Sequence, residues 1–178
     1  MLETPRLLLR PMRADDLELD ALLGIFTDPL VLTAFDTTPF DRTQMQRWRQ
    51  RNLAHQTQHG YGLFAVLLKE SGELIGDCGL EQMEVEGAMQ AELGYDLRSD
   101  HWGRGLATEA ASAVRDFAFE QLQLPHLIGL IRQGNFASCR VAEKVGLRHD
   151  SDLTQHGVVY WLYALKRDEF KATAPRLS

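Results

Sequence analysis

Two glycines, Gly103 and Gly105, flank Arg104 at the point where a helical pattern begins. Glycine in the first turn of a helix costs about 1 kcal/mol relative to alanine, so the pair must serve another purpose. The N-terminus of a helix presents unpaired backbone N–H groups and the positive end of the helix dipole. Without Cβ atoms, the two glycines let a phosphate approach that backbone closely, and Arg104 adds a positive charge beside it. The segment therefore predicts a binding site for a pyrophosphate group.

The same segment leaves the identity of its ligand open. A glycine turn before a helix is also a common structural feature that binds nothing. No Gly-Lys-Ser or Gly-Lys-Thr follows, so the segment is not the phosphate loop of P-loop nucleotidases. It is not the dinucleotide-binding fingerprint either, since the glycine spacing differs and a predicted β-hairpin precedes it instead of a βαβ unit. A nucleotide binder that uses this loop in another way is one remaining alternative.

Hydrophobic periodicity predicts the elements that position this loop. Apolar runs indicate strands, and apolar residues that repeat every three or four positions indicate helices. Pro29 and Pro39 flank a stretch that we expect to be irregular, and Gly94, inside a strand, is expected to mark a β-bulge. The predicted strands cover residues 6–11, 61–68, 73–80, 89–97, 126–132 and 157–167, and the predicted helices start near residue 14, at Asp41, at Leu106 and at Asn135. This mixture predicts an α/β (α+β) fold.

Composition limits the class of protein. The chain has 178 residues, 44% hydrophobic and 25% charged, which is typical of one globular domain. A net charge of −6 argues against a nucleic-acid-binding surface and suits a cationic substrate such as an amine. No apolar run approaches the roughly 18 residues of a membrane span. Cys78 and Cys139 are far apart and expected to be buried thiols, and the histidines lack metal-ligand spacing. We therefore expect a cytoplasmic protein with no metal, nucleic-acid or membrane partner.

Several longer motifs resemble those of a known family. The segment WGRGLATEA, residues 102–110, resembles the acetyl-coenzyme A pyrophosphate loop of the GNAT superfamily of N-acetyltransferases, usually written Gln/Arg-x-x-Gly-x-Gly/Ala. Trp102 stands where that pattern has Gln or Arg, whereas Gly105 and Ala107 fill its other positions. The segment NFASCRVAEKVGL, residues 135–147, is similar to a helix of the RimJ/RimL-like branch, the ribosomal-protein alanine acetyltransferases. That branch is also matched by TPRLLLR at 4–10, LIGDCGL at 74–80 and VYWLYAL at 159–165.

The resemblance implies a fold and a cosubstrate. It implies a twisted, mixed and mostly antiparallel sheet of six to seven strands with about four helices, in a single domain over residues 1–170 with a tail at 171–178. The fourth and fifth strands, residues 89–97 and 126–132, would splay apart in a V and admit the pantetheine arm of acetyl-coenzyme A, whose amides satisfy unpaired backbone groups. The implied cofactor-binding residues are Tyr95, Leu97, Trp102, Gly103, Arg104, Gly105, Leu106, Ala107, Thr108, Asn135 and Ser138.

The implied reaction is direct attack of an amine on the thioester, which needs a base for the amine and an acid for the departing thiolate. By resemblance, Ser138 protonates the thiolate; its alternatives are to cap its helix or to bind the cofactor. Glu92 is the first candidate for the general base, acting through ordered water, and its alternative is a solvent-facing strand residue. Asp77 and His156 are the reserve candidates for the base. Backbone N–H groups after Gly94 are placed to stabilise the oxyanion.

The acceptor depends, by resemblance, on the first two helices and the loop before the last strand, here residues 15–59 and 151–157. The RimJ/RimL likeness favours the N-terminal α-amine of a protein or peptide. A small amine (a polyamine, an aminoglycoside or an amino acid) is the alternative acceptor. A non-catalytic regulator that binds acyl-coenzyme A is the alternative function, because fold alone does not determine function. We expect a monomer or a homodimer.

Overall fold

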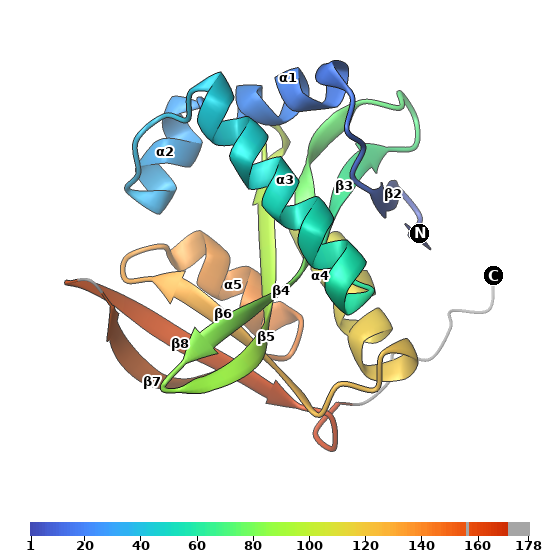
Figure 1. Ribbon diagram of the computed structural model, residues 1–178. Coiled ribbons are helices and arrows are strands. Elements are labelled where there is room, and N and C mark those ends of the chain that lie inside the picture. Colours follow the sequence, from blue (N-terminus) through green and yellow to red (C-terminus); the bar gives the residue numbers. More distant parts are fainter. Residues whose placement is uncertain (156, 171–178) are drawn as a thin grey trace.

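The computed structural model describes residues 1–155 and 157–170, and within them eight strands form one sheet in the order β1-β2-β3-β4-β5-β6-β8-β7 (Figure 1). Neighbouring strands are antiparallel except β5 and β6, which are parallel. His156 and the expected tail, residues 171–178, lie outside the described residues. The strands are β1 (Leu2–Glu3), β2 (Leu7–Pro11), β3 (Leu63–Leu68), β4 (Leu74–Val85), β5 (Ala88–Leu97), β6 (His126–Arg132), β7 (Arg148–Gln155) and β8 (Val158–Lys166).

Helices cover both faces of this sheet (Figure 1). In the described part of the chain they are α1 (Asp16–Ile25), α2 (Pro29–Phe35), α3 (Arg42–His59), α4 (Leu106–Asp116) and α5 (Phe136–Lys144). The first three bury apolar residues such as Leu22 and Met45 against one face. On the other face, α4 and α5 do the same through residues such as Leu106 and Ala142. No helix among these described elements is long and apolar enough to cross a membrane.

Local sequence explains where three of the helices begin. Asp41 accepts a hydrogen bond from the Gln44 backbone N–H, and the Gln44 side chain accepts one from the Asp41 N–H, which forms a capping box for α3. Asn135 caps α5 by accepting a hydrogen bond from the Ser138 N–H at 3.1 Å. Gly105 is the N-cap of α4, in the left-handed conformation that favours glycine. The predicted starts at Asp41, Leu106 and Asn135 are thereby confirmed within one residue.

The expected mixed, mostly antiparallel sheet is confirmed, but the described residues form eight strands instead of six to seven, and five helices instead of about four. The edge strand β7 was missed because its residues are polar and largely exposed, so they carry no core periodicity. The helix α2 lies in the stretch expected to be irregular. Pro29 opens this helix, and the Asp28 carboxylate accepts a hydrogen bond from the Leu30 N–H. Proline here starts a helix instead of interrupting one.

The predicted splay lies between β5 and β6, the fifth and sixth strands once β1 is counted. Along these two fully described strands, pairing is confined to Glu92 and Ile128. Beyond that point the Leu130 N–H donates to the Glu92 side-chain carboxylate at 3.1 Å instead of to a backbone carbonyl of β5. The carboxylate of Glu92 thus occupies a position that a backbone carbonyl would take in a continuous sheet.

The expected β-bulge at Gly94 is wrong. The strands β4 and β5 pair along their whole length without a register shift, and Gly94 lies directly opposite Gly79. Of these two opposed glycines, Gly79 is the one that requires glycine, because a Cβ there would overlap the backbone of Gly62 and Leu63. A Cβ on Gly94 would only touch the Leu63 Cδ2 atom at 3.8 Å, an ordinary contact distance.

We therefore expect Gly79→Ala to destabilise the fold and Gly94→Ala to leave its stability nearly unchanged. The methyl group added at Gly79 meets backbone atoms that cannot rotate away, and overpacking of this kind costs about 1–3 kcal/mol. Denaturant titration of the wild type and both variants gives the free energies of unfolding. Equal values for the two variants would contradict the close approach of Gly62 to Gly79.

Candidate functional site

Two cavities meet where β5 and β6 diverge. The smaller has a volume of about 270 Å³ and lies between the end of β5, the segment before α4, and α5. The larger has a volume of about 400 Å³ and lies between the sheet on one side and α2, α3 and the segments that flank α2 on the other. Both are lined by Phe35, Tyr95, Asp96, Asn135 and Ser138. Molecules bound in the two cavities would therefore meet beside these shared residues.

The glycine segment forms one side of the smaller cavity. Gly103 and Gly105 have φ angles of 72° and 77°, in the left-handed region that side chains disfavour. The N–H groups in the first turn of α4 have no partner within the helix, so they are available to an anion. The expected cofactor-binding residues that line this cavity are Tyr95, Leu97, Trp102, Gly103, Gly105, Leu106, Ala107, Thr108, Asn135 and Ser138.

Arg104 is placed differently from the other expected cofactor residues. It is absent from the lining of the smaller cavity, and its guanidinium Nη1 lies 3.0 Å from the Nδ1 atom of His101. The backbone of this segment, and not the Arg104 side chain, therefore faces the cavity. Trp102 lines the cavity with 39% of its surface exposed, and its indole N–H donates to the Leu97 carbonyl at 2.7 Å.

The N-terminal segment holds the glycine loop in place. The Arg6 guanidinium donates to the Arg104 carbonyl at 2.9 Å and forms an ion pair with Glu109 at 2.7 Å. The Glu109 carboxylate also accepts hydrogen bonds from the Thr4 hydroxyl at 2.6 Å and from the Arg6 backbone N–H at 2.9 Å. Partial burial alone would raise the pKa of Glu109, but these hydrogen bonds outweigh it and lower the pKa. Glu109 therefore stays ionised and clamps the start of α4.

Ser138 lies at the junction of the two cavities. Its backbone N–H donates to the Asn135 side chain, and its backbone carbonyl accepts a hydrogen bond from the Tyr95 hydroxyl at 2.8 Å. Tyr95 thus fixes the first turn of α5 against β5. Asn135 caps the helix, so Ser138 does not take the capping role that was one alternative for it. The geometry leaves the Ser138 side chain beside both cavities.

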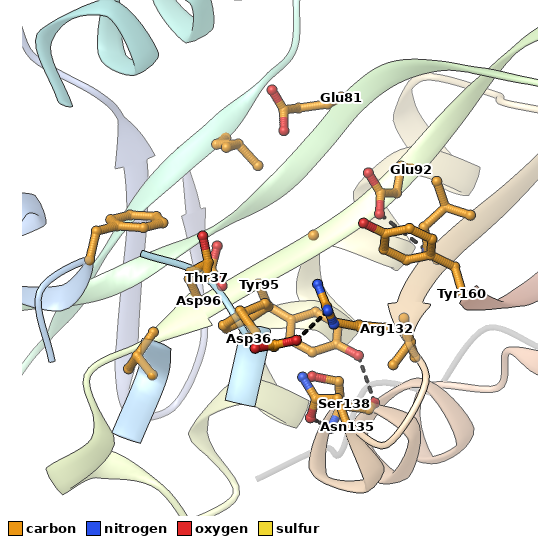
Figure 2. A pocket seen from close by; sticks show the side chains of 18 of the residues that line it. Asp36, Thr37, Glu81, Glu92, Tyr95, Asp96, Arg132, Asn135, Ser138 and Tyr160 are labelled. Atoms are coloured by element: carbon orange, nitrogen blue, oxygen red, sulfur yellow. Dashed lines mark hydrogen bonds and ion pairs between the residues drawn. The ribbon is translucent and has the colours of Figure 1, made fainter. Parts of the chain in front are cut away.

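Three carboxyl groups line the larger cavity from the sheet: Glu81, Glu92 and Asp96 (Figure 2). Burial raises the pKa of Glu92 to about 7, with further increases from Glu81 and Asp96 that the Leu130 N–H only partly offsets. Burial also raises the pKa of Asp96 to about 7, with the negative charge of Glu81 adding to the effect. Near neutral pH, both groups can therefore accept or release a proton.

Asp77, the reserve candidate for the base, is placed away from the cavity lining. It lies directly opposite Asp96 and is completely buried. Burial, and then the charges of Asp96 and Glu81, raise its pKa well above the usual range for a carboxyl group. Of the carboxyl groups named from the sequence, Glu92 is the one that the structure places against the larger cavity.

The remaining walls of the larger cavity come from residues that sequence reasoning missed. An aromatic wall is formed by Phe26, Phe35, Phe40 and Trp48. Arg132 pairs with Asp36 at the cavity lining (Figure 2). The signal for Asp96 was present, since Glu92 and Asp96 are the charged residues of the strand and share one face at a spacing of four. The aromatic residues come from α2, α3 and the segments on either side of α2, and only the tertiary fold brings them together.

Comparison with known proteins identifies the family. The profile of the acetyltransferase (GNAT) domain matches residues 6–148 of the chain. The chain belongs to the GNAT acetyltransferase family. The expected membership is thereby confirmed, and the chain is an acyltransferase.

Known GNAT proteins are similar to this chain over nearly its whole length. The uncharacterized N-acetyltransferase p20 of Bacillus licheniformis is 32% identical over 179 residues, covering 94% of this chain and 97% of that protein. The solved acetyltransferase of Agrobacterium tumefaciens is 33% identical, with a TM-score of 0.78 and coverage of 92% of each chain. RimJ of Mycobacterium smegmatis, solved in complex with CoA-disulfide, is 24% identical, with a TM-score of 0.75 and coverage of 92% of this chain and 83% of that chain. The likeness to RimJ is one of fold.

For this GNAT protein we expect Glu109→Gln to weaken binding of acetyl-coenzyme A about tenfold. The neutral amide loses the charge-assisted hydrogen bonds from Thr4 and Arg6, each of a kind worth about 1.5–3 kcal/mol, and so loosens the glycine loop. Calorimetric titration with acetyl-coenzyme A measures the affinity. Glu120→Gln, the same change at an exposed position, is the matched control. Equal affinity in both variants would show that the clamp has no part in binding.

Proposed function

We propose that the protein transfers the acetyl group of acetyl-coenzyme A directly to a primary amine. The observation that carries this proposal is the meeting of two unlike cavities at Tyr95, Asp96 and Ser138. One cavity ends at a glycine-lined helix N-terminus suited to a pyrophosphate, and the other is lined by carboxyl groups suited to an amine. We take residues 1–170 as the single domain that performs the reaction.

The residues of the smaller cavity fit coenzyme A. The N–H groups at the start of α4 and the two left-handed glycines, Gly103 and Gly105, support binding of the pyrophosphate. The diverging edges of β5 and β6 present backbone groups without strand partners, which the amides of the pantetheine arm can satisfy. When bound, the cosubstrate supplies the acetyl thioester. Residues of this chain provide the proton transfers.

The proposed transfer needs two proton movements. Glu92 accepts the proton of the attacking amine through ordered water, since its pKa of about 7 lets it act near neutral pH. Its hydrogen bond from the Leu130 N–H holds the carboxylate in place. The nitrogen–carbon bond forms as the carbon–sulfur bond breaks, and the Ser138 hydroxyl gives its proton to the departing thiolate and regains one from solvent. Ser138 is supported in this role by its place beside both cavities.

Two acceptor classes have separate support. The motifs shared with the RimJ/RimL-like branch favour the N-terminal α-amine of a protein or peptide. The carboxyl groups and aromatic wall of the larger cavity favour a small cationic amine. Because the cavity is a property of this chain itself, we give it the greater weight.

Calorimetric titration tests the cosubstrate. We expect acetyl-coenzyme A to bind with micromolar affinity and ATP to give no signal, because the glycine loop lacks the features of a nucleotide-binding loop. Gly105→Glu should remove most of this affinity, since it places a negative side chain where the pyrophosphate would bind. Gly87→Glu is the matched control, because Gly87 has a similar φ of 78° in the β4–β5 turn. Unchanged affinity in Gly105→Glu would refute the pyrophosphate site.

The pH dependence of kcat/KM tests the base. The ionised carboxylate is the active form, so activity should fall as the pH drops below about 7 and level off above it. The ionisation of an alkylamine acceptor gives its own transition near pH 10, well separated from that of Glu92. Glu92→Gln should lower kcat/KM about 100-fold or more and abolish the transition near pH 7. Asp96→Asn, which removes the other carboxyl group of raised pKa, should retain that transition. If it disappears in Asp96→Asn and persists in Glu92→Gln, Asp96 is the base.

A further inference from the structure

The larger cavity holds more carboxyl groups than the proposed transfer uses. Glu92 serves as the base and Asp96 lies at the junction with the smaller cavity, whereas Glu81 has no part in the transfer. Glu81 lies directly opposite Glu92, and Asp77 lies directly opposite Asp96, so two pairs of carboxyl groups share one face of β4 and β5. Like charges directly opposite each other on neighbouring strands destabilise a sheet.

The chain does not offset this charge within the residues that the structure describes. Among those lining the larger cavity, Arg132 is the basic residue, and its guanidinium is joined to Asp36 (Figure 2). Across residues 1–155 and 157–170, neither Glu81 nor Asp96 forms an ion pair with a basic side chain. In the same part of the chain, both carboxyl oxygens of Asp77 are buried without a hydrogen-bond partner. A positive charge on the acceptor would supply what this face lacks.

The facing wall of the cavity is aromatic. The rings of Phe26 and Phe40 are stacked with their centroids 5.2 Å apart, and the Trp48 ring lies 5.2 Å from that of Phe26. Aromatic faces attract ammonium groups and pack well against hydrocarbon. A volume of about 400 Å³ suits a small molecule. A small organic cation therefore matches both walls.

We propose that the acceptor is a small amine that carries a second ammonium group, and that Glu81 is the specificity-determining residue that binds this second charge. The inference rests on the proposed acetyl transfer: one amine attacks the thioester and gives its proton to Glu92, while the other remains charged. Glu92 is turned toward β6 by its hydrogen bond with Leu130, which leaves Glu81 on β4 as a separate anionic position (Figure 2). Linear polyamines and aminoglycosides share this chemistry.

Matched acceptors that differ by one charge test the inference. The pairs are n-butylamine with 1,4-diaminobutane and n-octylamine with 1,8-diaminooctane, each assayed for kcat/KM at saturating acetyl-coenzyme A. We expect the diamine of at least one pair to exceed its monoamine about tenfold, the effect of one charged hydrogen bond. Kanamycin distinguishes a cyclic polycation from a linear one. A peptide whose N-terminal α-amine is its only cation represents the alternative acceptor.

Variants then test whether Glu81 binds the second ammonium group of the acceptor. In Glu81→Gln the diamine-to-monoamine ratio should fall close to one. Glu84→Gln is the matched control, because Glu84 lies on the same strand, is exposed and points to the opposite face of the sheet. In that control the ratio should stay at its wild-type value.

Each outcome bears on the inference. Preference for a diamine or for kanamycin supports it, and the choice between them identifies a linear or a cyclic frame. Equal efficiency of monoamines and diamines, or preference for the peptide, overturns it while acetyl transfer itself stands. An unchanged ratio in Glu81→Gln overturns the role of Glu81. If acetyl-coenzyme A binds but no amine is acetylated, the proposed function fails and the inference fails with it.

Discussion

The site depends on an interruption in the hydrogen bonding of the sheet. Parallel strands β5 and β6 pair at Glu92 and Ile128 and then separate, although unpaired backbone groups inside a protein are costly. The interruption is stable because side chains form hydrogen bonds in place of the missing strand pairing. The Glu92 carboxylate binds the Leu130 N–H, and the Tyr95 hydroxyl holds the first turn of α5 against β5. Both cavities open from this divergence, so the residues that keep the strands apart also border the proposed chemistry.

Much of the fold could be predicted from the sequence where burial imposes a clear period. The strand His126–Arg132 and the start of α4 at Leu106 match their predictions, because their apolar residues face a buried core. The elements that the sequence did not predict lack this hydrophobic period. The strand β7 is polar and exposed, and α2 begins with a proline, a residue that usually interrupts a helix. The sequence around Gly94 does not reveal that the close backbone contact lies at Gly79, on the neighbouring strand.

The candidate site also has a part that the sequence predicts and a part that it does not. The glycine loop and Asn135 are contiguous in sequence with the helices that they start, so local patterns predicted both. The larger cavity is assembled from α2, α3, β3, β4, β5, β6, α5, β8 and the segments that flank α2, and no local pattern marks it. The structure also explains why the N-terminal and loop motifs occur together in this chain. Thr4 and Arg6 in the first motif bind Glu109 in the second, so these contacts join the two motifs.

Successive residues of β5 point to opposite faces of the sheet and so serve different purposes. Leu93 and Leu97 point into the core beneath α4 and α5, whereas Glu92 and Asp96 point to the other face and border the larger cavity. A substitution at Leu93 or Leu97 changes the packing of the core, and Leu97 also lines the smaller cavity. A substitution at Glu92 or Asp96 alters the lining of the larger cavity and leaves the core beneath α4 and α5 intact. Point mutations on one face of β5 can therefore reshape the larger cavity without rebuilding the core on the other face.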